Sequence, residues 1–179
     1  ENYWWNLDEV HASYSGVKTE GITKHNIFLF GGYARLEDQS LDGLALTACH
    51  ELGHGIGGAP YKSNASSTEG QSDFYATRTC LPVVFKYLKS TRPLAADKYI
   101  LKSCKTDMCS RLLTAIKSSI MFFEYLGDYT AFETPSLEVS YEINHSPTYY
   151  PSSQCRIDTY VSGALNKPRP KCWFPSKEL

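Results

Sequence analysis

The stretch from Cys49 to Gly58 constrains the fold more than any other part of the 179-residue chain. It reads Cys-His-Glu-Leu-Gly-His-Gly-Ile-Gly-Gly, with His50 and His54 four residues apart. In a helix, side chains at this spacing project from one face, about one turn apart. We therefore predict a helix here, ended by the run of glycines and by Pro60.

The same stretch carries the pattern His-Glu-x-x-His, which is typical of catalytic zinc sites. The two imidazoles would be zinc ligands, and Glu51 would be placed to act on a water bound to the metal. The expected cofactor is therefore Zn²⁺, held by His50 and His54, with Glu51 as general base. The alternative is an ordinary amphipathic helix with two surface histidines.

A third ligand is expected after the motif, because a catalytic zinc site usually has three protein ligands and keeps one position for water. Glu69 and Asp73 are four residues apart and would share one face of a helix. With Glu69 as the ligand, Asp73 would accept a hydrogen bond from the outer nitrogen of a ligating imidazole and fix its tautomer. Asp73 as the third ligand is the alternative.

These two motifs together resemble those of the gluzincins, the thermolysin-like zinc metallopeptidases. The resemblance covers residues 25–80 and implies a zincin-like fold, zinc ligation by Glu69 and hydrolysis of peptide bonds. Glu69 follows His54 by 15 residues, a shorter gap than in thermolysin, so no subfamily is identified. Metzincins have a third histidine where this chain has Pro60, and the aspzincin motif around Asp73 is absent.

The resemblance also implies a hydrogen-bond donor for the tetrahedral oxyanion, supplied in thermolysin-like enzymes by a histidine downstream of the ligand helix. His145 is the histidine that follows the motif, whereas His11 and His25 precede it, so we predict His145 in this role. Reserve donors lie in the same part of the chain: Tyr149, Tyr150 and Tyr160. For Arg156 we expect a contact with a substrate carbonyl or a salt bridge with Asp158.

Hydrophobic spacing predicts one strand and several helices. The strand is expected at residues 25–30, with an extension over 33–36, and would form the edge of a substrate cleft. Residues 1–24 are expected to turn at Gly16 and Gly21. The helices are expected at residues 41–54, 69–80 with a kink or division at Pro82, 95–101, 108–126 and 154–163.

Two of these helices have recognisable first residues. Asp38 or Ser40 can cap the motif helix, whose expected buried stripe consists of Leu41, Leu44, Ala45, Ala48 and Leu52. The helix that starts at Glu69 can be capped by Ser66, Ser67 or Thr68. We therefore predict an α+β fold over residues 1–179: a compact, mostly helical single domain with a small sheet beside the metal-binding helix.

Charge and hydropathy exclude some partners. The chain has 18 basic and 19 acidic residues, so it lacks the basic surplus expected of a protein that binds nucleic acid or an anionic membrane. It also lacks an apolar run of transmembrane length. We expect a monomer whose partner is a protein or peptide substrate.

The six cysteines are scattered and without Cys-x-x-Cys pairs, which favours disulfides over a structural zinc site. Cys104 and Cys109 would close a short loop, and Cys155 and Cys172 would tie down the C-terminal segment. Cys49 is expected to be either bridged or a buried free thiol. Because the chain begins without Met and is rich in cysteine, we expect a mature exported protein, secreted or periplasmic.

A zinc metallopeptidase is therefore the expected function. Two alternatives remain: a hydrolase of cell-wall peptides or amide links, and a non-catalytic binding module stabilised by zinc. Glu51 argues against the module, because a purely structural zinc site is usually closed by four ligands and has no use for this carboxylate.

Overall fold

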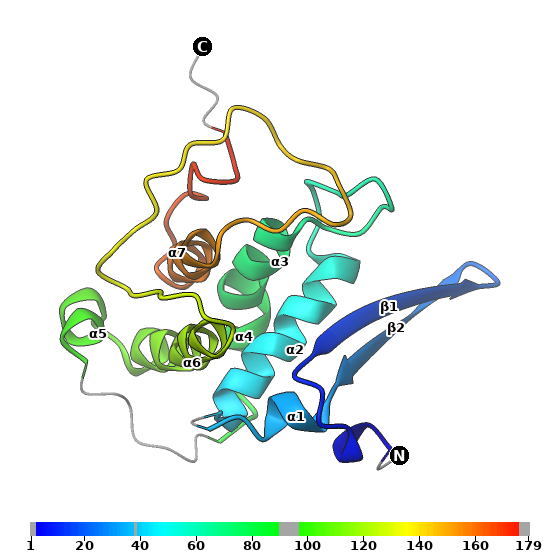
Figure 1. Cartoon of the computed structure of the whole chain (residues 1–179), viewed down its shortest axis with the longest axis horizontal. Helices are drawn as coiled ribbons and strands as arrows, with labels where there is room; N and C mark the ends of the chain where they lie inside the picture. Colours follow the sequence, from blue (N-terminus) through cyan, green and yellow to red (C-terminus); the bar gives the residue numbers. More distant parts are fainter. Residues whose placement is uncertain (1–2, 38, 90–96, 176–179) are drawn as a thin grey trace.

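The computed structural model describes residues 3–37, 39–89 and 97–175. Helices pack together around the motif helix, and an antiparallel hairpin extends from one side of them (Figure 1). The elements in chain order are η1 (Trp4–Asn6), β1 (Ala12–Thr19), β2 (Ile22–Leu29), α1 (Gly31–Ala34), α2 (Leu41–Ile56), α3 (Glu69–Tyr75), η2 (Ala76–Cys80), α4 (Leu81–Val84), α5 (Lys98–Ser103), α6 (Asp107–Tyr125) and α7 (Ser153–Ala164). The predicted α+β class is confirmed, with the small sheet in contact with α2.

The hairpin corrects the prediction for the first 24 residues. Strands β1 and β2 pair along their full length around a two-residue turn. Glu20 and Gly21 in that turn have φ of 51° and 82°, as a type I′ turn requires. Gly21 is thus at a turn as predicted, whereas Gly16 lies inside β1. The outer half of β1 is exposed to solvent, so no alternation of apolar residues marked it as a strand.

The predicted strand extension over residues 33–36 is wrong, because the chain forms the short helix α1 there. Tyr33 is buried in it, and the Tyr33 hydroxyl lies 2.6 Å from Oγ1 of Thr47 on α2. This contact, together with the glycines that begin α1, turns the chain from the hairpin toward the motif helix.

Helix α2 begins at the predicted cap: the Ser40 hydroxyl accepts a hydrogen bond from the Gly43 amide at 2.9 Å. Asp38, the other predicted cap, lies outside the described residues. The predicted buried stripe is wrong, since Leu41 is half exposed while Leu46 and the polar residue Asp42 are buried. Asp42 is buried because Arg111 of α6 donates two hydrogen bonds of 2.8 Å to its carboxylate. The remaining buried residues of this face include Cys49, His50, Glu51 and Gly53.

Helix α3 begins at Glu69 and is capped by Thr68, as predicted. It continues through the π-helical turn η2 into α4, so Pro82 lies in the first turn of α4, where proline is tolerated. Cys49 of α2 and Cys80 of η2 form a disulfide, which corrects the alternative of a free thiol at Cys49. This bond ties the motif helix to the helix that carries Glu69.

The last three helices agree with the predicted ones within a few residues, and residues 95 and 96 of the predicted 95–101 helix lie outside the described residues. The largest fully buried apolar side chains define the core between α2, α4, α5, α6 and α7: Leu46, Leu81, Ile100, Leu113, Ile116 and Ile157. The predicted disulfides Cys104–Cys109 and Cys155–Cys172 are both present. Within the described residues, no helix has both the length and the apolar composition needed to cross a membrane.

Candidate metal centre

Two imidazoles of α2 are held in one defined tautomer. The Nδ1 atom of His50 lies 2.7 Å from Oδ1 of Asp73, and because a carboxylate only accepts, this nitrogen carries a proton. Nδ1 of His54 donates to the Ser67 main-chain carbonyl at 2.9 Å, with the Ser72 hydroxyl at 3.0 Å. Each ring therefore keeps Nε2 for a proton or a metal ion.

The carboxylate of Glu69 lies between these two nitrogens. Its Oε2 is 3.3 Å from Nε2 of His50, and its Oε1 is 3.4 Å from Nε2 of His54. Two ligands of a tetrahedral zinc ion, each about 2.0–2.1 Å from the metal, are about 3.3–3.4 Å from one another. Each of the two contacts, made by a different oxygen of Glu69, has the separation expected of one pair of zinc ligands. Close packing of the helices makes this approach possible, because a Cβ on Gly53 would lie 2.9 Å from Cα of Ser72.

Glu51 lies beside the two histidines and is buried. His50, Glu51 and His54 offer ligand atoms within 4.8 Å of one another, so these three residues form a group that could hold a metal ion. Burial raises the pKa of Glu51, and the nearby negative charge of Glu69 raises it further. A carboxyl group with a raised pKa is a stronger proton acceptor once it is ionised.

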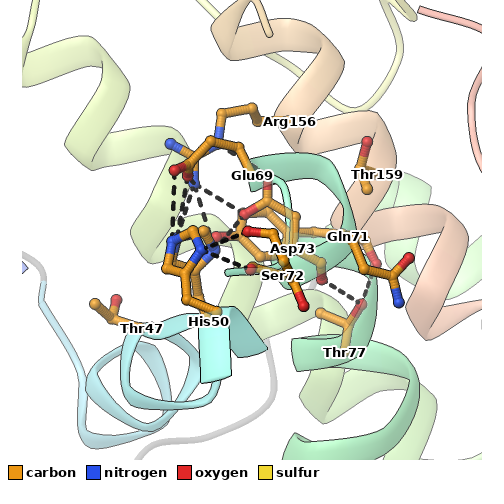
Figure 2. Close-up of polar contacts among 12 residues, drawn as sticks. Thr47, His50, Glu69, Gln71, Ser72, Asp73, Thr77, Arg156 and Thr159 are labelled. Atoms are coloured by element: carbon orange, nitrogen blue, oxygen red, sulfur yellow. Dashed lines mark hydrogen bonds and ion pairs between the residues drawn. The ribbon is translucent and has the colours of Figure 1, made fainter. Parts of the chain in front are cut away.

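Asp73 is the point where α7 joins the site. Arg156 of α7 donates to both carboxylate oxygens of Asp73, at 2.8 and 2.9 Å, and its guanidinium lies 3.5 Å from the His50 ring and from Oε2 of Glu69. Figure 2 shows these residues converging from three helices, α2, α3 and α7. The predicted pairing of Arg156 with Asp158 is wrong, because Arg156 pairs with Asp73. Asp73 also lies on the outer side of the His50 ring, where it accepts a hydrogen bond from Nδ1 of His50.

The charges of the site are strongly coupled. Burial alone would lower the pKa of His50, but the carboxylate of Asp73 and the hydrogen bond to Glu69 outweigh it and raise the pKa to about 10. Burial and the neighbouring His50 lower the pKa of His54 to about 4. Burial would raise the pKa values of Glu69 and Asp73, yet His50 and Arg156 hold both below their ordinary range. Without a metal, the doubly protonated imidazolium of His50 thus bridges two carboxylates, with its Nδ1–H toward Asp73 and its Nε2–H toward Glu69.

Lys62 is a member of the site that the sequence did not indicate. It is buried, and its Nζ donates to Oε1 of Glu69 at 2.6 Å and to the Pro147 carbonyl at 3.3 Å. The Tyr150 ring lies 5.5 Å from the same ammonium group. Lys62 follows Pro60 in a loop without periodic pattern, so no sequence signal linked it to Glu69.

An open cleft of about 880 Å³ leads to these residues. The hairpin forms one wall of the cleft, through residues 10–14 and through His25. The opposite wall includes side chains from α6, α7 and the preceding loop: Ser119, Phe122, Phe123, Tyr150, Arg156 and Tyr160.

The structure does not bring His145 to this cleft. Its exposed ring hydrogen-bonds through Nδ1 to the main-chain carbonyl of Tyr61, and it is not among the cleft-lining residues. We therefore withdraw His145 as the oxyanion donor. Of the reserve tyrosines, Tyr150 and Tyr160 line the cleft and Tyr149 does not. Both histidines that precede the motif, His11 directly before β1 and His25 of β2, line the cleft instead.

Comparisons of the chain with protein-family models, with curated proteins and with solved structures find no match.

Proposed function

We propose that this protein is a zinc-dependent metallopeptidase of the gluzincin type, with His50, His54 and Glu69 as zinc ligands. The observation that carries the proposal is the spacing of the Nε2 atoms from the Glu69 carboxylate, 3.3 and 3.4 Å. Two imidazoles and one carboxylate are a donor set that zinc uses in catalytic sites. Asp73 is excluded as the third ligand in this proposal because it accepts from the outer nitrogen of His50.

Zinc in this site would supply a Lewis acid for the scissile carbonyl and an acidified water. Glu51 accepts the proton of the attacking water and passes it to the leaving amine. Asp73 keeps His50 in the tautomer that presents Nε2, and Arg156 holds Asp73 in place. Lys62 engages one oxygen of Glu69 and so restrains the rotation of that carboxylate.

The edge of β1 supports an extended peptide as the substrate. The Phe30 amide donates to the His11 carbonyl, and because pairing alternates along an antiparallel strand, the main-chain groups of Ala12 and Tyr14 point away from β2. Residues 10–14 all line the cleft, and since successive side chains face opposite ways, the strand meets the cleft along its edge. A peptide bound there would add a strand to the hairpin. The first strand, and not the predicted strand at 25–30, would thus be the substrate-binding edge.

The three disulfides support an exported enzyme, since such bonds persist in oxidising compartments. One of these bonds, Cys49–Cys80, lies next to the proposed zinc site. Cys49 directly precedes the ligand His50, and the bond links the two helices that carry the proposed ligands.

The test is proteolysis of denatured casein by the purified chain with a metal assay in parallel. We expect activity that a chelator abolishes and zinc restores. Glu51→Gln should retain zinc and lose activity, and Glu69→Ala should lose zinc. The matched control is Glu124→Gln, which changes an exposed glutamate of α6 and should alter neither quantity.

Three results would contradict the proposal. Casein cleavage by Glu51→Gln at the wild-type rate would remove the proposed general base. Unchanged zinc content in Glu69→Ala would remove the proposed ligand. Tight zinc binding without cleavage of any peptide would instead identify a zinc-stabilised binding module.

A further inference from the structure

Tyr14 of β1 and His25 of β2 form a hydrogen-bonded pair on the wall of the cleft. The Tyr14 hydroxyl lies 2.8 Å from Nδ1 of His25. Both side chains line the cleft, and the Tyr14 ring is 6.5 Å from the ring of His54. The pair therefore stands next to a proposed zinc ligand.

Two glycines give this pair its position. A Cβ on Gly16 would lie 2.5 Å from the Tyr14 hydroxyl oxygen, so the phenol lies across the next residue on its own face of β1. A Cβ on Gly55 would collide with the same hydroxyl and would lie 2.6 Å from Nδ1 of His25. The pair thus rests directly on the surface of α2.

The helix geometry relates this position to the chemistry. Gly55 is four residues after Glu51, so both belong to the same face of α2, one turn apart. The Tyr14 hydroxyl therefore lies over the face that carries the proposed general base, next to the ligand His54. A substrate bound along the edge of β1 would pass between these groups.

The hydrogen bond also determines where the phenol proton can go. A phenol has one proton, and Nδ1 of a neutral imidazole either carries a proton or accepts one. If Nδ1 of His25 is protonated, it donates to the Tyr14 oxygen, and the Tyr14 proton is free to point into the cleft. A phenol is protonated at neutral pH, and burial raises the pKa of Tyr14 further above its ordinary value.

We propose that Tyr14 is the catalytic residue that donates a hydrogen bond to the oxyanion formed during peptide hydrolysis, and that His25 is a positioning residue that donates to the Tyr14 oxygen. This inference rests on the proposed peptidase function. It places the oxyanion donor on the hairpin that precedes the motif, and not downstream of the ligand helix where the family resemblance predicts it. The donor is in place before substrate binds, because Gly16, Gly55 and His25 fix the phenol.

The first test does not depend on activity. Nitrogen-15 NMR of the zinc-loaded protein reports which ring nitrogen of the neutral His25 imidazole carries the proton. We expect the Nδ1-protonated tautomer of His25. The Nε2-protonated tautomer would mean that Tyr14 donates to His25 and has no proton for an oxyanion, which would overturn the inference.

The second test measures kcat and KM on casein-derived peptides. Tyr14→Phe should lower kcat by about 10²–10³-fold, the range for loss of one oxyanion donor, with KM and zinc content unchanged. His25→Phe should also lower kcat, whereas His25→Gln, whose amide can still donate, should lower it less. The matched control is Tyr129→Phe, which changes a tyrosine that is 91% exposed and should leave kcat unchanged.

The outcomes separate this inference from the proposed function. Wild-type kcat in Tyr14→Phe, together with an inactive Glu51→Gln, would overturn the role of Tyr14 and leave the peptidase intact. A zinc-loaded wild-type chain that cleaves no peptide would overturn both.

Discussion

The most informative single substitution is Asp73→Asn, because Asp73 joins α3, α2 and α7 at one point. Its carboxylate accepts from His50 Nδ1 at 2.7 Å and from Arg156 at 2.8 and 2.9 Å, and its side chain is fully buried. An asparagine of nearly the same shape keeps one acceptor oxygen but carries no charge. The substitution therefore removes the charge compensation of Arg156 without opening a cavity.

The expected loss of stability follows from this geometry. Removing one partner of a buried ion pair destabilises a protein by about 3–5 kcal/mol, and the remaining amide oxygen of Asn places this case at about 3 kcal/mol. In a chain of this length, about 3 kcal/mol corresponds to a melting temperature lowered by about 6–12 °C. Thermal unfolding of the metal-free protein, followed by circular dichroism, measures it.

The same substitution tests the zinc site. Loss of a carboxylate behind a ligating histidine weakens metal binding by about 10–100-fold, or about 1.4–2.7 kcal/mol. Competition with a chromophoric chelator at pH 7 gives the dissociation constant. In the wild type, zinc must also displace the proton on Nε2 of His50, whose pKa the Asp73 carboxylate raises, so apparent affinity should rise about tenfold per pH unit between pH 7 and 9. That slope should flatten in Asp73→Asn.

The matched control is Asp8→Asn, which also changes an aspartate paired with an arginine. Asp8 lies 2.6 Å from Arg35, but its side chain is 96% exposed. An exposed pair of this kind contributes about 0–1 kcal/mol, and zinc affinity should not change. If Asp73→Asn unfolds and binds zinc as the wild type and the control do, the proposed coupling between Asp73, His50 and the metal is refuted.

Three further perturbations have defined outcomes. Stability of the metal-free protein should be greatest near pH 6.5. The contribution of His50 is complete below its unfolded pKa of 6.5 and is lost as pH rises toward its folded pKa of about 10. Below pH 6.5 stability falls because the unfolded chain protonates His54, whose folded pKa is about 4, and below pH 4.5 the contribution of Glu69 is lost as well. Urea unfolding across pH 3–10 tests this, and stability that still rises above pH 7 would contradict it. Lys62→Met should destabilise the metal-free protein by about 1–3 kcal/mol, because Glu69 loses a buried hydrogen-bond donor. It should also strengthen zinc binding, because the Lys62 ammonium that contacts Glu69 repels the metal. Weaker zinc binding, measured by chelator competition, would contradict this. Gly53→Ala should weaken zinc binding by at least about tenfold, because the added Cβ would push Ser72, and α3 with it, away from α2. Wild-type zinc affinity in the same assay would show that the two helices can move apart without disturbing the site.

Local sequence rules predicted those parts of the structure that depend on neighbouring residues. Ser40 and Thr68 begin their helices because a hydroxyl at these positions satisfies a free amide of the first turn. His50 and His54 share a face because four residues make about one helical turn. The disulfide between Cys104 and Cys109 closes within one short segment.

Features that depend on contacts between distant segments were not predicted. Arg156 and Asp73 are 83 residues apart, and no local pattern distinguishes Asp73 from Asp158 as its partner. The buried face of α2 was misassigned because it carries polar groups that other helices satisfy, such as Asp42. The family resemblance predicted an oxyanion donor after the motif, whereas the hairpin, which precedes the motif, brings Tyr14 and His25 to the cleft.

The central claim is that His50, His54 and Glu69 form one zinc centre. A crystal structure of the zinc-loaded protein, with anomalous data at the zinc edge, tests it most directly. We expect one zinc ion with Nε2 of both histidines and one oxygen of Glu69 at about 2.0–2.2 Å, and with Asp73 still bonded to Nδ1 of His50. Zinc bound by Asp73 in place of Glu69, or bound away from these histidines, would contradict the account.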